Sequence, residues 1–128
     1  MSFDPWGRAF TANHTGPLYH RVFPGSYVEG LPQPRGGTLK ALPDDPEDGL
    51  VRISPIGEQV TRLNHPEQSG YFSGACSPKF YGGGAFGPDF NNSIFVCDVV
   101  LNLVHRRILG ADAPSFIARL DDRAKAEE

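Results

Sequence analysis

The longest run of apolar residues suited to burial spans residues 93–109, SIFVCDVVLNLVHRRIL. Residues 93–100 are rich in β-branched and aromatic side chains, and residues 102–109 alternate between apolar and polar side chains. Because little more than Leu101 lies between the two halves, the pattern predicts a central hairpin of two antiparallel strands and a tight turn. A helix over residues 94–109 is the alternative, but β-branching and the absence of a helix start signal favour strands.

A second hairpin is predicted near the N-terminus. The DPWG sequence at residues 4–7 is a turn signal, and short strands are predicted over residues 8–12 and 18–23 with a polar connection over 13–17. Like the central hairpin, this unit places an Asn and a His near the link between its two strands. Two similar hairpins suit an array of small sheets such as a propeller.

Residues 24–50 show no clear strand pattern. They hold several prolines, the Gly36-Gly37 pair and the acidic run DDPED at residues 44–48. Such a segment buries little apolar area, so we predict a long loop or insertion on the surface. The acidic run is typical of a solvated loop. A cation site is the alternative, which Pro46 and the absence of EF-hand spacing disfavour.

The remaining segments predict shorter elements. Alternation favours a strand over residues 50–56, the start of another at 60–63, and a strand over 115–120. Residues 121–128 have the composition of a helical start with acidic residues first. The glycine-rich stretch at 82–88 predicts a connection between strands and not a phosphate-binding loop, because no Lys-Ser/Thr pair follows it.

Composition narrows the class of protein. The chain has 128 residues and an apolar share of 39%, enough for one modest core, and its 15 Gly and 12 Pro indicate many turns, as in an all-β fold. The net charge is −3 and no basic cluster is interleaved with aromatics, which argues against a nucleic-acid surface. No apolar run is long enough for a transmembrane segment, and the N-terminus lacks the pattern of a signal peptide.

The chain has two cysteines, Cys76 and Cys97, with neither a CxxC pair nor a haem-attachment CxxCH. The favoured interpretation is two buried small apolar side chains. A disulfide is the alternative, and it requires an oxidising compartment and Cα atoms close enough to be bridged. No metal site is predicted, because no two histidines have a spacing typical of metal ligands.

Three sequence elements together resemble a known family. Residues 92–98 (NSIFVCD) and 102–106 (NLVHR) resemble the "FVCEP…NLVHR" signature of large propeller proteins known as membrane-bound dehydrogenases. This family is related to L-sorbosone and soluble quinoprotein sugar dehydrogenases. FDPWGRAF at 3–10, followed by Asn13 and by PLYH at 17–20, resembles its "FDRWGN…N…PLYH" unit, and SGAC at 73–76 resembles its "SACG" element.

The resemblance implies an all-β, six-bladed β-propeller, of which residues 1–128 form a single partial segment of about two blades. It also implies a periplasmic or exported bacterial protein with the remaining propeller blades and a cytochrome c domain as partners, and pyrroloquinoline quinone and calcium as cofactors. A piece of a propeller leaves sheet edges unpaired, so we expect poor stability of the chain alone.

The function expected from this resemblance is the oxidation of a sugar or alcohol, in which a His base removes the hydroxyl proton while hydride passes to a quinone-type cofactor. His105 is the first candidate for this base and His20 the second. The residues expected to orient substrate or cofactor are Asn13, Asp98, Asn102 and Arg106. The alternative is a non-catalytic propeller segment that binds carbohydrate or a protein partner through its loops and whose histidines are structural.

Overall fold

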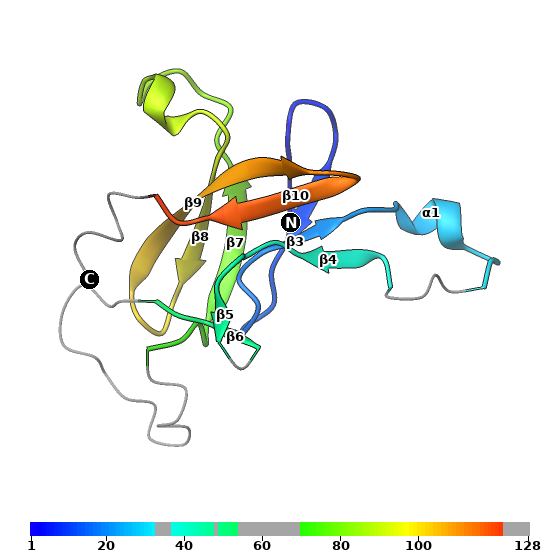
Figure 1. The fold of residues 1–128 in the computed structure, drawn as a ribbon, viewed down its shortest axis with the longest axis horizontal. Coiled ribbons are helices and arrows are strands. Elements are labelled where there is room, and N and C mark those ends of the chain that lie inside the picture. The colour runs from blue at the N-terminus through cyan, green and yellow to red at the C-terminus, as the bar shows by residue number, and fades with distance from the viewer. Residues whose placement is uncertain (33–36, 48, 54–69, 122–128) are drawn as a thin grey trace.

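The computed structural model describes residues 1–32, 37–47, 49–53 and 70–121. The described chain is mostly β, with two four-stranded antiparallel sheets and one short helix, α1 (Gly25–Val28) (Figure 1). The N-terminal sheet has the order β1-β2-β3-β4, with strands β1 (Ser2–Phe3), β2 (Ala9–Thr11), β3 (Tyr19–Arg21) and β4 (Leu39–Ala41). The C-terminal sheet has the order β10-β9-β8-β7, with strands β7 (Ala75–Phe80), β8 (Ser93–Asp98), β9 (Leu103–Asp112) and β10 (Ser115–Arg119).

Both sheets are simple meanders, because each strand pairs with the next one along the chain. A small two-stranded sheet, β5 (Pro46–Glu47) and β6 (Leu50–Val51), lies between them in sequence, and a 3₁₀ turn at Pro88–Phe90 precedes β8. The expectation of a β fold with many short elements is therefore confirmed at this level.

The central hairpin is formed by β8 and β9, so the helical alternative for this stretch is wrong. Its turn is longer than expected: β8 ends at Asp98, β9 begins at Leu103, and β9 continues to Asp112 instead of ending at 109. The Asp98 carboxylate accepts hydrogen bonds from the backbone N–H groups of Val100 and Leu101, at 2.9 and 3.0 Å, and this ends the strand early.

The N-terminal hairpin is formed by β2 and β3, whose strands are shorter than predicted. The segment over 24–50 is not only a loop or insertion, because it contains α1 and also β4, which pairs with β3 and completes the N-terminal sheet. The strand predicted over 50–56 is reduced to β6 in the described part of the chain. The elements predicted at 60–63 and 122–128 lie outside the described residues.

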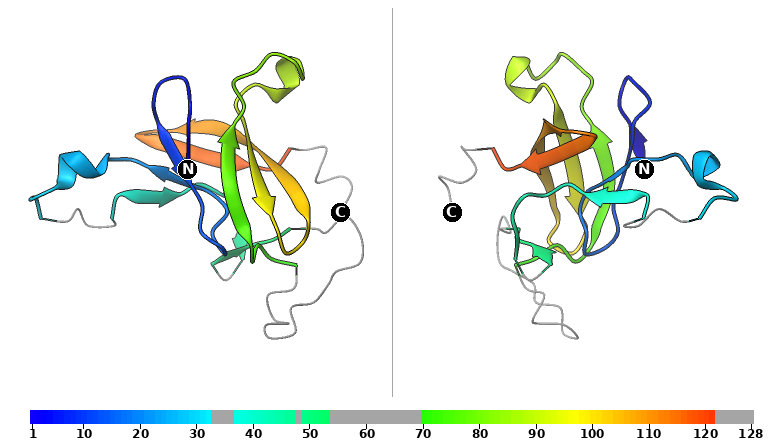
Figure 2. Two further views of the ribbon diagram at one scale, coloured as in Figure 1. Left: turned by 180° about the vertical axis from the view of Figure 1, so that it is seen from behind. Right: turned by 45° about the vertical axis from the view of Figure 1, so that its right-hand side comes forward.

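The core lies between the two sheets. Its fully buried apolar side chains come from both sheets and from the segments next to them: Phe10, Leu18, Leu42, Phe72, Ile94, Val96 and Ala118. Figures 1 and 2 show β7 beside the N-terminal strands, where it contacts β1 and β2. At the other edge, the backbone N–H of Ala118 in β10 donates to the Leu42 carbonyl just after β4, at 2.7 Å. The two sheets therefore meet along both edges.

The C-terminal sheet also carries apolar side chains on the face turned away from the core, which we call the outer face. Strand register places Cys97 opposite Val104 and Phe95 opposite Arg106 on this face. The same face holds Ile108 and Ile117. Each of these residues is next in its strand to buried residues, and successive residues of a strand point to opposite faces. Val104 is 62% exposed. A sheet that is apolar on both faces is typical of a layer with a neighbour on each side.

The two faces predict opposite responses to truncation in the 128-residue chain. Ile94→Ala removes a fully buried side chain from the core and should lower the free energy of unfolding by about 3 kcal/mol. Val104→Ala removes an exposed side chain of similar size and should change it by about 0.5 kcal/mol or less. Urea unfolding measures both values, and equal losses would contradict the assignment of the two faces.

Candidate functional site

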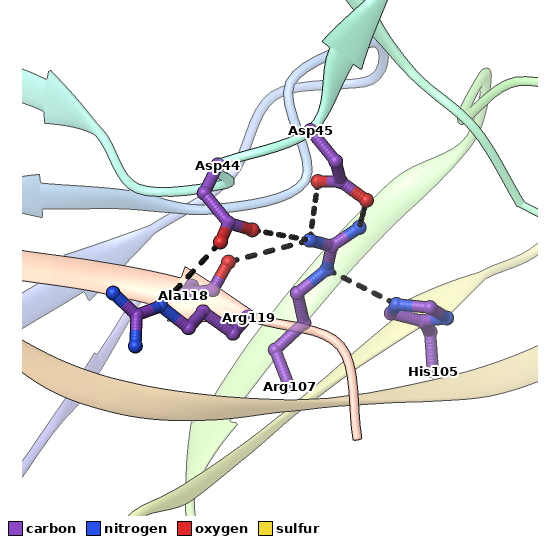
Figure 3. Close-up of polar contacts among 6 residues, drawn as sticks. All are labelled: Asp44, Asp45, His105, Arg107, Ala118 and Arg119. Carbon is purple, nitrogen blue, oxygen red and sulfur yellow. Dashed lines mark hydrogen bonds and ion pairs between the residues drawn. The ribbon is translucent and has the colours of Figure 1, made fainter. Parts of the chain in front are cut away.

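The most strongly interacting polar group in the described structure is Arg107 on β9. Its side chain is 1% exposed, and its Nη1 and Nη2 donate to the two carboxylate oxygens of Asp45 at 2.5 and 3.0 Å (Figure 3). Asp45 lies just before β5, in the acidic run that was expected to be a solvated loop. A buried guanidinium remains charged, and the bidentate pairing with Asp45 offsets the free-energy cost of removing this charge from water.

Further polar groups complete this cluster. Arg107 Nη1 also donates to the carbonyl oxygen of Ala118 at 3.3 Å and lies 3.9 Å from an Asp44 carboxylate oxygen. Asp44 pairs in turn with Arg119 of β10 at 3.5 Å. Figure 3 shows these groups converging from the 44–45 segment and from both strands. We call these residues, together with His105, the Arg107 cluster.

His105 is the one predicted catalytic residue that lies in the Arg107 cluster. Its Nε2 accepts a hydrogen bond from Arg107 Nε at 3.1 Å, which leaves the ring proton on Nδ1, and its ring packs edge-on against Phe72. Burial, and then the neighbouring Arg107 charge, lower the pKa of His105 to about 4 against a weaker opposing effect of Asp45. The ring is therefore neutral at physiological pH, but the nitrogen that could accept a proton is already occupied by Arg107.

His20, the second predicted base, lies in a different environment on β3. It is 5% exposed, its Nδ1 lies 2.7 Å from the Ser115 hydroxyl, and its ring packs against Phe10 and Phe116. Burial, and then the charge of Arg8, lower the pKa of His20. The contacts of His20 and His105 are separate, so the structure does not bring the two candidate bases together.

A pocket of about 460 Å³ opens beside His20, which is within the usual size range of small-molecule sites. Arg8 and Arg21 contribute to its wall, together with apolar side chains that include Phe3 and Val22. Within the described part of the chain, no buried side-chain nitrogen or oxygen lacks a hydrogen-bond partner. His20 lines this pocket, and no partner is found among the described residues for its Nε2.

Asp98 joins two backbone segments through hydrogen bonds to its carboxylate. It is 1% exposed, and its second oxygen, Oδ2, accepts hydrogen bonds from the N–H groups of Ser73 and Gly74 at 3.1 and 3.0 Å, in addition to the two bonds within the turn. These four bonds satisfy the buried carboxylate. Asn102, also predicted to orient substrate, is exposed in the same turn with φ of 52°, a conformation that Asn tolerates better than most residues.

The other two predicted orienting residues also make internal contacts. Asn13 closes the β2–β3 connection, with its Oδ1 accepting from the backbone N–H groups of Thr15 and Gly16 at 3.2 and 2.5 Å. Arg106 lies on the outer face and bonds Ser93 Oγ at 2.9 Å and Asp121 at 2.7 Å. Alternation along β9 thus directs Arg106 away from the Arg107 cluster.

Sequence reasoning did not identify Arg107 or Asp45. One signal was available: Arg107 lies at i+4 from Leu103 and i−2 from Leu109, on the face that the alternation of β9 assigns to the core. A charge at such a position requires a buried partner, and the acidic run at residues 44–48 is one of the clusters of carboxylates that could supply it. Which carboxylate it pairs with could not be derived, because Arg107 and Asp45 are 62 positions apart.

The described residues form no calcium site, and the two arginines at the middle of β9 are not free to bind a quinone. No group of three or more His, Cys, Asp or Glu side chains in the described segments could hold a metal ion such as calcium. Arg106 and Arg107, which could meet the carboxylates of a quinone, are already paired with Asp121 and Asp45. No helix within the described ranges is long and apolar enough to cross a membrane.

Comparison with known proteins gives one match. A family model described as "Domain of unknown function (DUF7133)" matches residues 1–128. No curated protein and no solved structure matches the chain.

The lowered pKa of His105 predicts a pH-dependent stability. Between the unfolded value of about 6.5 and the folded value of about 4, the unfolded chain binds a proton that the folded chain does not. The free energy of unfolding should therefore decrease as the pH falls through this range, by up to about 3 kcal/mol from His105. Urea unfolding of wild type and His105→Gln between pH 7 and pH 4 tests this. The variant should show the smaller slope, and parallel profiles would contradict the assignment.

The Arg107 cluster predicts a large effect at one arginine and a small effect at another. Arg107→Met leaves Asp45 without its bidentate partner and should lower the free energy of unfolding by about 3 kcal/mol. Arg119→Met is the matched control, because the Arg119 side chain is 64% exposed and its pairing with Asp44 should be worth about 0.5 kcal/mol. Similar losses in the two variants would show that the buried pair is not a principal contact.

Proposed function

The chain belongs to the DUF7133 family, and we propose that it supplies two adjacent blades to a larger, six-bladed β-propeller dehydrogenase that oxidises a sugar or alcohol. The proposal has two parts, a propeller fold for the longer protein and a chemistry for the pocket beside His20. The first part depends on packing, and the second on the family resemblance together with the geometry of His20.

One observation carries the propeller proposal: the C-terminal sheet has apolar side chains on both faces, among charged ones on the outer face, but the N-terminal sheet covers only the core face. A blade of a propeller packs against a neighbour on each side, so both of its faces must be apolar. The meander order of the two four-stranded sheets agrees with the order of strands in propeller blades. The outer face, with Val104 at its surface, is then the side that receives the next blade.

Two of the three family-like sequence elements lie together in the C-terminal sheet, whereas the FDPWGRAF and PLYH unit lies in the N-terminal sheet. SGAC leads into β7, FVCD ends β8 and NLVHR begins β9, and Asp98 joins the first two through its bonds to Ser73 and Gly74. The contacts of these elements stabilise one sheet, which we propose is one blade. For this reason we infer the propeller fold from the resemblance before any activity. The dehydrogenase activity is inferred from the same resemblance.

Of the two candidate bases, His20 is the better placed for the proposed oxidation. In the tautomer in which Nδ1–H donates to Ser115 Oγ, His20 Nε2 carries a lone pair that would accept the proton of a substrate hydroxyl bound in the pocket that His20 lines. Its lowered pKa keeps the ring neutral at physiological pH. Arg8 and Arg21 line the same pocket and would orient polar groups of the substrate. His105 serves instead as the acceptor that positions Arg107.

The described residues form no calcium site, so we assign calcium, and with it the quinone and the hydride-accepting step, to other blades. A cytochrome c domain and an exported or periplasmic location belong to the same proposal for the longer protein. None of the contacts within this chain depends on them.

The experiment is a dehydrogenase assay of the longest polypeptide that contains this chain, supplied with pyrroloquinoline quinone, calcium, a panel of sugars and alcohols, and a dye acceptor. His20→Ala should lower kcat by about 100-fold or more. His105→Gln should lower stability while keeping kcat within about threefold of wild type, since its role is positional. His14→Ala is the control for losing an exposed histidine. Turnover unaffected by His20→Ala would contradict the assignment of the base.

A second candidate function, carbohydrate binding without turnover, is favoured by one observation. The connection between β7 and β8 presents an aromatic cluster in which Phe86, 60% exposed, stacks on Tyr81 at 5.0 Å between ring centroids and also contacts Phe90. Exposed aromatic rings suit the apolar faces of sugars. Sugar binding in the same panel that needs Phe86 but gives no turnover in wild type would support this function instead of the dehydrogenase.

A further inference from the structure

The two cysteines of the chain lie directly opposite each other in the C-terminal sheet. Strand register pairs Cys76 of β7 with Cys97 of β8, next to the pair of Ala75 and Asp98. Opposed residues of antiparallel strands have Cα atoms about 4.5 to 5.5 Å apart, a separation that a disulfide can bridge. Their side chains also project from the same face of the sheet. The pairing thus supplies the proximity that sequence alone could not show.

Both thiols lie on the outer face, away from the packed core. Val96 and Asp98, the neighbours of Cys97, are buried on the core face, and alternation directs the Cys97 side chain to the other side. Both cysteines are half-buried, and Cys97 borders an open pocket of about 680 Å³ that is also lined by Pro78 and Lys79. In the 128-residue chain, where no further blade covers the outer face, a small thiol or disulfide reagent can therefore reach the pair.

We propose that Cys76 and Cys97 form a cross-strand disulfide when the protein meets a disulfide oxidant such as oxidised glutathione. One cysteine thiolate attacks the oxidant, forming a mixed disulfide and releasing one reduced glutathione. The second cysteine then attacks the protein sulfur of that mixed disulfide and releases the second reduced glutathione. Two protein thiols and one oxidised glutathione thus give one protein disulfide and two reduced glutathione molecules.

This bond would join β7 to β8 across the connection that carries the aromatic cluster of Tyr81, Phe86 and Phe90. The bond closes a loop in the unfolded chain and so reduces its conformational freedom, which stabilises the folded state. The inference rests on strand register and does not depend on the proposed dehydrogenase activity.

The test is a redox equilibration of the 128-residue chain with mixtures of reduced and oxidised glutathione, in buffer and in concentrated urea. Products are trapped by alkylation and identified by mass spectrometry. In buffer, the pair should favour the intramolecular disulfide over mixed disulfides by at least about 100-fold more than in urea, because the fold holds the two sulfurs together. Reduction of the oxidised chain should lower its Tm by about 10 °C.

The matched control carries Cys76→Ala with Lys79→Cys, so it keeps two cysteines at a similar separation in sequence. Register pairs residue 79 with Phe95, so the new thiol is not opposite Cys97. This variant should show little more preference for the intramolecular disulfide in buffer than in urea. Equal preference in wild type and control, or glutathione adducts as the main wild-type product in buffer, would overturn the inference.

Discussion

The buried charge of Arg107 is the constraint on which the contact between the two sheets depends. A guanidinium cannot lose its proton under physiological conditions, so the fold must supply a carboxylate at its position. Asp45 meets this requirement only if the segment after β4 lies against β9 and β10, where the backbone bond from Ala118 to Leu42 also holds it. The tautomer of His105 follows from the same geometry, because Arg107 Nε donates to His105 Nε2 and the ring proton is therefore on Nδ1.

Asp98 plays the corresponding role within the C-terminal sheet. Its four bonds to backbone N–H groups tie the start of β7 to the β8–β9 turn, and both segments belong to elements in which the chain resembles the propeller family. A carboxylate with this number of backbone donors is fully occupied, so it has little capacity left to orient a substrate. The residues that make the sequence recognisable are thus largely residues that hold a blade together.

The two candidate bases show how similar sequence contexts can lead to different chemistry. His20 and His105 both lie on strands near a hairpin link, and burial lowers the pKa of both. In His105 the accepting nitrogen is bonded to a buried arginine, whereas His20 lines a pocket and no partner is found for its Nε2 among the described residues. The difference arises from the tertiary contacts around each ring, which the local sequence does not encode.

The sequence by itself determined the features that depend on near neighbours: the β class, the two hairpins and the apolar faces of residues 93–109, because alternation and turn residues act over a few positions. Only the tertiary structure decided that β4 completes the N-terminal sheet, that Arg107 finds Asp45 from 62 positions away, and that Cys76 faces Cys97. These contacts depend on strand register and on the packing of one sheet against another. Both are set by the total burial of the chain, and no local pattern specifies them.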